Sequence, residues 1–554
     1  MLSNRLPHNA SVKALLAATS LFVVIAVAIT WPQAARLATD ASEHHDVYFN
    51  MWRMGWAAHA AISPGTAFLD GNIFFPERHT LTFSDAMPVA SATAMPLLWL
   101  GVPPVLVHNL VLFAGILLSA VGIFVLARSL TGSAAAGATA GVVFGFAAYR
   151  FEHLGHMELQ WTVWIPWAFW ALERIRASGR WRDGALLGLF LALQFMSSIY
   201  YGIYLVCLMG VAIGCSLVID LRGKRPLTGQ LIAFAVAGAV ALILCLPYAV
   251  PYLAQRPAGG DRDIREVAQY SATPASYLAA STSNVLYGAV TAQFGAPEKR
   301  LFPGLLPVFL AVACLVWRRT TTTLIYGVGL LAAFELSLGA NGTIYPLLYY
   351  HAPGFSSLRA PARLGVFVLF FLGVLAAFGH AALARRLTPR MTRVLSAAIW
   401  IVLLAEYCVA PLPLTPIPNT PPPLYAWLAL QPPGVVAELP VPAPGALPGD
   451  DARHSYMSTF HWRPLVNGYS GYYPESYLRL LERLRFQPGR SVEILRLTGV
   501  KYVIVHFASW NPEESIAAAK ILTEDATVSI IGQFDDGHGV AMVFRLEELA
   551  TQDK

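Results

Sequence analysis

The residues best suited to acid–base chemistry lie between the first two apolar stretches of the chain. Residues 42–53 read Ser-Glu-His-His-Asp-Val-Tyr-Phe-Asn-Met-Trp-Arg. An acid such as Asp46, flanked by His45 and aromatic side chains, could act as a general base, with a pKa set by its neighbours in the fold. Asp46 could also cap the helix predicted for residues 47–60, because aspartate is a favoured N-cap residue. The two roles are compatible.

Asp85 is a second acid in the same connection. It is a further catalytic candidate that could bind an acceptor or a metal ion. It could also simply cap a helix that starts near Pro88.

Arginines near the tenth apolar stretch could bind a phosphate. Arg359 and Arg363 lie four residues apart just before residue 364, a spacing that predicts one shared helix face. Guanidinium groups bind phosphate with charge-assisted hydrogen bonds. Arg150 is a third candidate. Interfacial snorkelling or pairing with an acid would explain the same arginines without a ligand.

Histidines after Arg150 offer metal or substrate contacts. His153 and His156 could hold a divalent ion such as Mg²⁺, Mn²⁺ or Zn²⁺ if the segment is helical and Glu152 joins them. The HExxH order is absent, so polar contact with a sugar or a neighbouring loop is favoured. His45 is a further candidate substrate contact. Tyr201 is a candidate sugar contact, although a place in the aromatic belt at the membrane interface fits it as well.

The composition indicates a membrane protein, because 56% of residues are hydrophobic, 13% are charged and the mean hydropathy is +0.54. Several apolar stretches approach the ~20 residues of a membrane helix. Eleven such stretches are predicted as spans, at roughly 12–31, 103–127, 133–148, 157–173, 184–199, 202–219, 229–253, 302–317, 321–338, 364–384 and 391–409.

Basic residues fall on every second connection between these stretches, which predicts the orientation in the membrane. Lysine and arginine next to spans stay on the cytoplasmic side, so the N-terminus is expected in the cytoplasm and the tail outside. This bias accounts for the net charge of +6 without a nucleic-acid partner. The residues concerned are Arg128, Arg174, Arg176, Arg180, Arg182, Arg222, Lys224, Arg225, Arg318, Arg319, Arg385, Arg386, Arg390 and Arg393.

The long exterior segments predict two domains. A transmembrane domain would cover residues 1–411, with exterior loops at 32–102, 254–301 and 339–363. A proline-rich linker then leads to an exterior domain over residues 412–554. Short strands and helices predict an α/β fold for that domain. The strands are expected at 434–440, 500–507, 528–534 and 540–546, and the helices near 475–485 and 512–522. It shows no phosphate loop and no Cys/His metal cluster.

Together these features resemble the GT-C superfamily of integral-membrane glycosyltransferases. The resemblance lies in Asp46 before an aromatic-rich amphipathic helix, the many later spans and the exterior C-terminal domain. The segments Asn-Ile-Phe-Phe-Pro at 72–76, Arg-Phe-Glu-His-Leu-Gly-His at 150–156 and Pro-Gly-Phe-Ser-Ser-Leu-Arg-Ala-Pro-Ala-Arg at 353–363 resemble bacterial members. They are short, but the similarity covers most of the chain.

The resemblance implies a polytopic α-helical fold of the bacterial inner membrane, with a periplasmic C-terminal domain. It implies transfer of a sugar from a polyprenyl-phosphate donor to a lipid, glycan or protein acceptor, with Asp46 as base and an inverting outcome. Arg359 and Arg363 would then stabilise the phosphate leaving group.

Two other functions remain open. A transporter or flippase for a lipid-linked saccharide would also need many spans and exterior arginines, but the chain shows no convincing internal repeat and few acids within spans. A noncatalytic scaffold in envelope assembly could keep the same spans.

Overall fold

The computed structural model describes residues 8–255, 261–409 and 411–547 and divides the chain into two compact units. The first, here called the helical unit, comprises Met1–Arg36, Leu110–Val250 and Ala258–Pro413. The second, the loop-tail unit, comprises Leu37–Asn109, Pro251–Pro257 and Leu414–Lys554. The first long connection, placed in the membrane domain from sequence, therefore folds in one unit with the tail.

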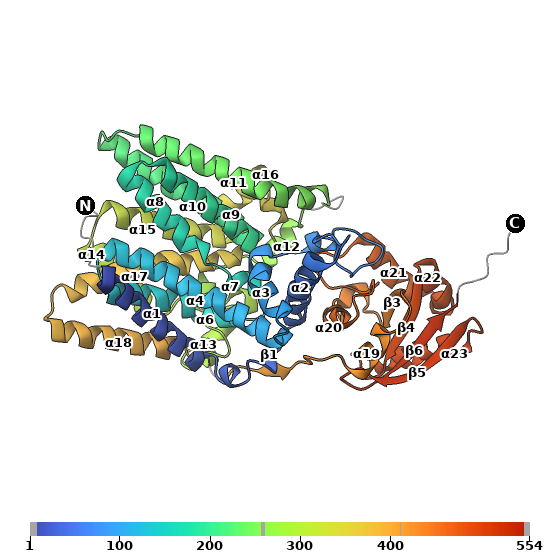
Figure 1. The fold of residues 1–554 in the computed structure, drawn as a ribbon. Coiled ribbons are helices and arrows are strands. Elements are labelled where there is room, and N and C mark those ends of the chain that lie inside the picture. Colours follow the sequence, from blue (N-terminus) through green and yellow to red (C-terminus); the bar gives the residue numbers. More distant parts are fainter. Residues whose placement is uncertain (1–7, 256–260, 410, 548–554) are drawn as a thin grey trace. The chain divides into compact units, whose positions relative to one another are not determined.

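In the described residues, each of the eleven predicted apolar stretches corresponds to a helix (Figure 1). These are α1 (His8–Ile29), α4 (Pro104–Thr131), α5 (Ala134–Phe146), α8 (Trp164–Ser178), α9 (Trp181–Ser197), α10 (Ile199–Arg222), α11 (Thr228–Ala254), α14 (Leu305–Trp317), α15 (Thr321–Ser337), α17 (Gly365–Ala384) and α18 (Pro389–Tyr407).

Six helical segments in the described part of the chain are long and apolar enough to cross a membrane, and two shorter apolar helices, α14 and α15, accompany them. The six are Val12–Ile29, Pro104–Thr131, Ala134–Glu152, Ile199–Arg222, Thr228–Ala254 and Pro361–Ala384. The predicted polytopic helical class is confirmed.

One predicted apolar stretch starts several residues before the long helix to which it corresponds. The stretch at 157–173 was expected to be continuous, but α7 (Met157–Gln160) is a separate turn and α8 starts at Trp164. The side-chain amide of Gln160 donates to the main-chain carbonyls of Arg150 and His153. These hydrogen bonds hold the end of α7 against residues 150–153, where the chain does not continue as one helix into α8.

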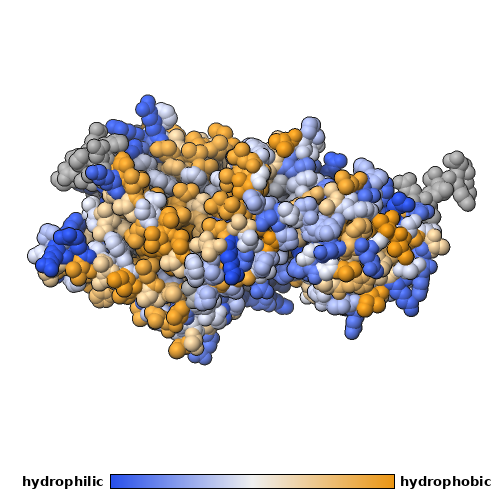
Figure 2. All heavy atoms as spheres, turned by 60° about the horizontal axis from the view of Figure 1, so that its bottom comes forward, coloured by the Kyte–Doolittle hydropathy of each residue, from blue (hydrophilic) through white to orange (hydrophobic). Residues whose placement is uncertain are grey.

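Helix α17 forms the core of the helical unit, where it packs against α5, α14 and α15. Every residue from Gly365 to Ala382 is buried, as expected for a helix that is apolar on all faces. The outer helices instead expose apolar side chains, among them Val24, Leu242 and Ile401. Figure 2 shows this apolar covering on one face, and such a surface suits lipid rather than water.

Connections that carry arginine or lysine residues lie next to each other in pairs. The Arg386 guanidinium lies 4.6 Å from the centre of the Trp317 ring, so the connections after α17 and α14 are neighbours. Gly179, after α8, contacts Gly229 at the start of α11. This pairing agrees with the predicted alternation, and the orientation in the membrane stays a prediction.

The loop-tail unit contains a small mixed sheet, as predicted for the tail. Its strands are β3 (Val435–Leu439), β4 (Val500–His506), β5 (Val528–Asp535) and β6 (Val540–Leu546), in the order β3-β4-β6-β5. Only β3 and β4 are parallel. The predicted strands and the helices α21 (Glu475–Phe486) and α23 (Pro512–Glu524) are confirmed.

Shorter elements complete this unit. Helices α2 (His45–Ile62) and α3 (Pro88–Trp99) come from the first connection, and α19 (Pro423–Ala429), α20 (Asp451–Met457) and α22 (Ser491–Leu497) from the tail. Part of the predicted proline-rich linker forms β2 (Leu414–Pro416), which pairs antiparallel with β1 (Asp40–Ser42).

The remaining α-helices belong to the connections of the helical unit. They are α6 (Ala148–Glu152), α12 (Ile264–Gln269), α13 (Gly288–Thr291) and α16 (Ile344–His351). Short 3₁₀ turns at Pro297–Lys299 and Pro361–Leu364 position charged residues.

Glycines on α9 allow α11 to approach closely, which predicts the effect of a substitution. A Cβ at Gly188 would lie 2.4 Å from the carbonyl oxygen of Ala237, so Gly188→Val must push the helices apart. We expect a loss of about 1–3 kcal/mol in stability, seen as a lower melting temperature in detergent. Gly210→Val on α10 is the matched control, because a Cβ there meets nothing within 4 Å. Equal melting temperatures for the two variants would contradict the packing.

Candidate functional site

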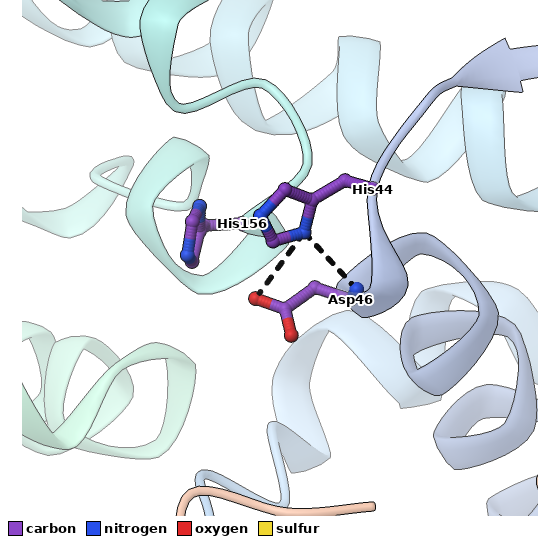
Figure 3. A group of neighbouring side chains, drawn as sticks. All are labelled: His44, Asp46 and His156. Carbon is purple, nitrogen blue, oxygen red and sulfur yellow. Dashed lines mark hydrogen bonds and ion pairs between the residues drawn. The ribbon is translucent and has the colours of Figure 1, made fainter. Parts of the chain in front are cut away.

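Asp46 lies in the first turn of α2, and the N-cap of this helix is His44. His44 has extended backbone angles, and its ring Nδ1 accepts a hydrogen bond of 3.1 Å from the Asp46 N–H. Figure 3 shows the Asp46 carboxylate beside the same ring, with Oδ2 3.9 Å from Nδ1. The prediction that Asp46 itself caps the helix is wrong. Its carboxylate is instead directed to other partners, at a helix end that favours negative charge.

The Asp46 carboxylate accepts a hydrogen bond from a tyrosine of the tail. The Tyr469 hydroxyl donates to Asp46 Oδ1 at 2.5 Å. The Tyr469 ring packs edge-on against Phe49, with ring centres 5.2 Å apart, and lies near the exposed His45. The Asp46 side chain remains 15% exposed. The acid is thus fixed in orientation and still partly open to solvent, as a proton acceptor must be.

Helix α2 is fixed within the loop-tail unit by contacts along its length. The Trp52 indole donates to Asn72 Oδ1 at 3.0 Å, and the Trp56 indole donates to the carbonyl of Phe68 at 2.9 Å. Gly55 faces the tail, and a Cβ there would lie at an ordinary contact distance of 3.4 Å from Thr459. Helix α20 packs on the same helix. Asp46 therefore sits at the end of a rigid element.

Asp85 is held near α2 through its main chain. The Arg53 guanidinium donates to the carbonyl of Asp85 and to Asn50 Oδ1, and it stacks over Phe49. Helix α3 has Met87 as its N-cap, without a side-chain cap. Asp85 is therefore not the N-cap of this helix, and its catalytic role stays a prediction.

Arg359 and Arg363 do not share a helix face, which corrects the sequence prediction. Helix α17 begins only at Gly365, and Arg359 precedes the turn at Pro361–Leu364. Proline disfavours the helical conformation of the residue before it, and Ala360, before Pro361, has φ −120° and ψ 83°, outside the helical region.

The two arginines instead meet around one tyrosine, Tyr200. The Arg359 main-chain N–H donates to the Tyr200 hydroxyl at 2.9 Å, and the Arg363 guanidinium lies 5.1 Å from the centre of the Tyr200 ring. Arg363 is buried and pairs with Glu298 at 2.9 Å. The Arg359 guanidinium stacks over Tyr270 and has no carboxylate partner among the described residues. Arg359 is therefore the arginine of this pair whose charge is not already balanced.

Charged groups around Glu298 explain its electrostatics. Burial alone would raise the pKa of Glu298, but the Arg363 guanidinium, together with His153 and His156, holds this pKa below its usual range. A second pair, Glu152 with Arg300 at 2.6 Å, lies nearby in sequence. Salt bridges thus link these connections of the helical unit.

The predicted metal group at residues 152–156 lacks the expected helix. Helix α6 ends at Glu152, His153 is its C-cap, and His156 is the N-cap of α7. The two histidine rings lie 5.7 Å apart, and the Glu152 carboxylate is bound by Arg300. A metal site at these residues stays a prediction, without the helical geometry on which it was based.

Arg150 and Tyr201 are both deeply buried. The Arg150 guanidinium donates to the Phe144 carbonyl at 2.6 Å and to Thr162 Oγ1 at 2.5 Å. It thereby links the end of α5 to the residues just before α8. This setting favours a structural role for Arg150 over phosphate binding. Tyr201 packs edge-on against Phe367. Their predicted contacts with donor and substrate stay predictions.

Three residues of the site were not among the candidates predicted from sequence, namely His44, Tyr469 and Glu298. His44 lies two residues before Asp46 in the sequence, so its capping role was available from the pattern. Tyr469 is 423 positions from Asp46, and Glu298 lies in a different connection from Arg363. The sequence gives no local signal for either pairing.

Comparison with known proteins adds little to this geometry. No protein-family model and no curated protein matches the chain. Among solved structures, the chain is similar to the crystal structure of ArnT from Cupriavidus metallidurans in the apo state, with 11% identity over 96% of this chain and 98% of that one. The TM-score is 0.38, which does not establish a common fold.

The buried Glu298–Arg363 pair predicts a pH-dependent stability. Glu298→Gln leaves Arg363 buried without its partner, and we expect a loss of about 3–5 kcal/mol at pH 7. Because folding lowers the pKa of Glu298, the stabilisation is present above the unfolded pKa of about 4.3 and declines as the pH falls below it. Melting temperatures of wild type and variant should therefore converge in acid.

The control for this prediction is an exposed pair of the same chemistry. Arg490 and Glu493 lie 2.8 Å apart on the surface of the tail, where such pairs contribute little. Glu493→Gln should leave the melting temperature unchanged. An equal effect of both substitutions would contradict the account of Glu298.

Proposed function

We propose that the chain is a membrane glycosyltransferase that moves one sugar from a polyprenyl-phosphate donor to an acceptor hydroxyl on the exterior face. The observation that carries this proposal is the Asp46 carboxylate, which is partly exposed, oriented by the Tyr469 hydroxyl and set at the start of the rigid helix α2. The resemblance of the chain to GT-C enzymes assigns the base to this same residue.

The proposed chemistry is a single displacement. Asp46 takes the proton of the acceptor hydroxyl, and the acceptor oxygen forms a bond to C1 of the sugar. The bond between C1 and the phosphate oxygen breaks, and the electron pair leaves with the polyprenyl phosphate. The Tyr469 hydroxyl is a positioning group, because it orients the carboxylate without touching the reacting atoms.

The donor phosphate requires a cation, and we assign it to Arg359. Its guanidinium has no carboxylate partner among the described residues and is oriented by the Tyr270 ring. Arg363 is already neutralised by Glu298, so we assign it to positioning Tyr200. The proposed substrate contacts are His45, His153, His156 and Tyr201. A divalent metal ion at His153 and His156 also stays part of the proposal.

The setting of this reaction is part of the proposal. We place the protein in the bacterial inner membrane, with its N-terminus in the cytoplasm and its tail in the periplasm. The basic connections between the helices support this orientation. The acceptor would be a lipid, a glycan or a protein.

The assignment of the base predicts that Asp46→Asn lowers transfer by about 10²–10⁴-fold. Purified protein in nanodiscs is given a panel of radiolabelled polyprenyl-phosphate sugars and a crude envelope fraction as acceptor. Glu43→Gln is the matched control, because Glu43 is an exposed acid of the same segment. Unchanged transfer by Asp46→Asn would overturn the base. If the same protein in sealed vesicles moves label across the bilayer chemically unchanged, a transporter is favoured instead.

The assignment of the phosphate ligand predicts a separate effect. Arg359→Gln removes a charge-assisted contact worth about 1.5–3 kcal/mol, so the KM for the donor should rise by about 10–150-fold. Arg265→Gln is the control, since Arg265 is an exposed arginine of the same unit. An unchanged donor KM in Arg359→Gln would remove Arg359 from the site.

A further inference from the structure

The interior of the tail holds a cluster of two histidines and a glutamate that the proposed reaction does not use. Glu438 lies on β3, His454 on α20 and His506 at the end of β4. Their side chains are 0%, 2% and 3% exposed. One ligand atom from each residue lies within 4.8 Å of the others.

Hydrogen bonding leaves part of this cluster unsatisfied. His506 Nε2 lies 2.7 Å from Glu438 Oε2, whereas His454 Nε2 lies 3.6 Å from the same oxygen, beyond hydrogen-bond reach. Both ring nitrogens of His454 and Oε1 of Glu438 are buried without a hydrogen-bond partner. Buried polar atoms normally find partners, so His454 Nε2 and Glu438 Oε1 indicate a partner that is missing from this site.

We propose that Glu438, His454 and His506 bind a divalent metal ion, with zinc the best match. Two imidazoles and a carboxylate form a ligand set suited to Zn²⁺. The unpartnered Oε1 allows Glu438 to bind through both oxygens, which would supply a fourth ligand atom. Zinc–nitrogen and zinc–oxygen bonds of about 2.0–2.2 Å place ligand atoms from different residues about 3.3 Å apart in a tetrahedron. The separations of Glu438 Oε2 from the two Nε2 atoms, 2.7 Å and 3.6 Å, lie on either side of this value.

Carboxylates behind both histidines support this assignment. A histidine that binds a metal usually donates its other ring N–H to a carboxylate or carbonyl. His506 Nδ1 lies 2.5 Å from Asp536 Oδ2, and His454 Nδ1 lies 3.8 Å from Asp451 Oδ1. Both histidines thus turn Nε2 toward Glu438 and Nδ1 toward an acid, and His506 is the one of the two that is hydrogen-bonded to that acid.

The charge balance of the pocket also fits a divalent ion. Glu438, Asp451 and Asp536 are buried here, and Arg453 is the buried guanidinium beside Asp536. With neutral histidines, three carboxylates and one guanidinium leave two negative charges, which a divalent cation neutralises. Protonation of both histidines would have the same effect. Burial disfavours a charged His506, but its hydrogen bonds to Asp536 and Glu438 raise its pKa to about 9.

A metal at this position would strengthen the support of Asp46. It would join α20 to the strand pair β3–β4, and α20 packs on α2. Asp451, behind His454, accepts a hydrogen bond of 3.0 Å from Asn467, two residues before Tyr469. The metal is therefore placed to hold both α2 and the segment that orients Asp46, which is a structural role.

The test is metal binding by the full-length protein in detergent. Protein stripped with a chelator is titrated with Zn²⁺ alone, and bound metal is measured by mass spectrometry. Co²⁺ is then substituted to read tetrahedral geometry from its visible absorption. We expect close to one Zn²⁺ per chain, tetrahedral Co²⁺ bands and a higher melting temperature on zinc addition. Loss of binding in His454→Gln would support the site.

Two further variants make the outcome decisive. His461→Gln is the matched control, because His461 is a histidine of the same domain that stacks on Tyr425 outside the cluster, and it should bind zinc as wild type does. Asp536→Asn should weaken binding by about 10–100-fold without removing a ligand. Folded wild-type protein that binds neither metal would overturn the proposal in favour of a proton network. Undiminished binding by His454→Gln would overturn the ligand assignment, and if that variant does not fold, the wild-type and Asp536→Asn titrations still decide.

Discussion

The hydrogen bond from Tyr469 to Asp46 is the contact on which the account of this protein depends. It joins the first turn of α2 to a tail segment 423 positions away, and hydrogen bonds to charged groups contribute about 1.5–3 kcal/mol. One contact of this size could not hold a helix, but it is joined by the Trp52–Asn72 bond, the packing of α20 on α2 and the β1–β2 pair. The tail is therefore part of the structure that positions the acid, and the first connection is not an independent loop.

In the helical unit, Arg359 and Arg363 look equivalent in sequence but differ in whether a carboxylate neutralises their charge. Burying an ion is costly unless it is paired, and Arg363 is buried against Glu298, with a second pair between Glu152 and Arg300. Arg359 is less buried and rests on the Tyr270 ring. A residue whose charge is neutralised stabilises the fold, whereas one whose charge is not can bind an anion. This difference, rather than their spacing, decides which arginine we assign to the donor.

Local patterns in the sequence predicted most of the fold but less of the site. Apolar length is a local property, and each of the eleven stretches corresponds to a helix, as each predicted strand of the tail does to a strand. The errors arose where a single residue changed the outcome. Pro361 ended the expected Arg359–Arg363 helix, Gln160 fixed the break before α8, and His44 capped α2 in place of Asp46.

Long-range pairings could not be predicted in the same way. The metal-site candidates come from β3, α20 and β4, so no local spacing brings them together, and the expectation of no Cys/His cluster rested on local spacing alone. One signal was present, because Glu438 interrupts the apolar strand Val-Val-Ala-Glu-Leu, and a buried charge in a strand requires a partner.

The measurement that tests the central claim most directly is a double-mutant cycle between Asp46 and Tyr469, read as kcat/KM for sugar transfer. If the tail orients the catalytic acid, Tyr469→Phe should lower kcat/KM by about tenfold in the presence of Asp46 and have no further effect in Asp46→Asn. An equal factor in both backgrounds, or no effect of Tyr469→Phe in either, would contradict the account.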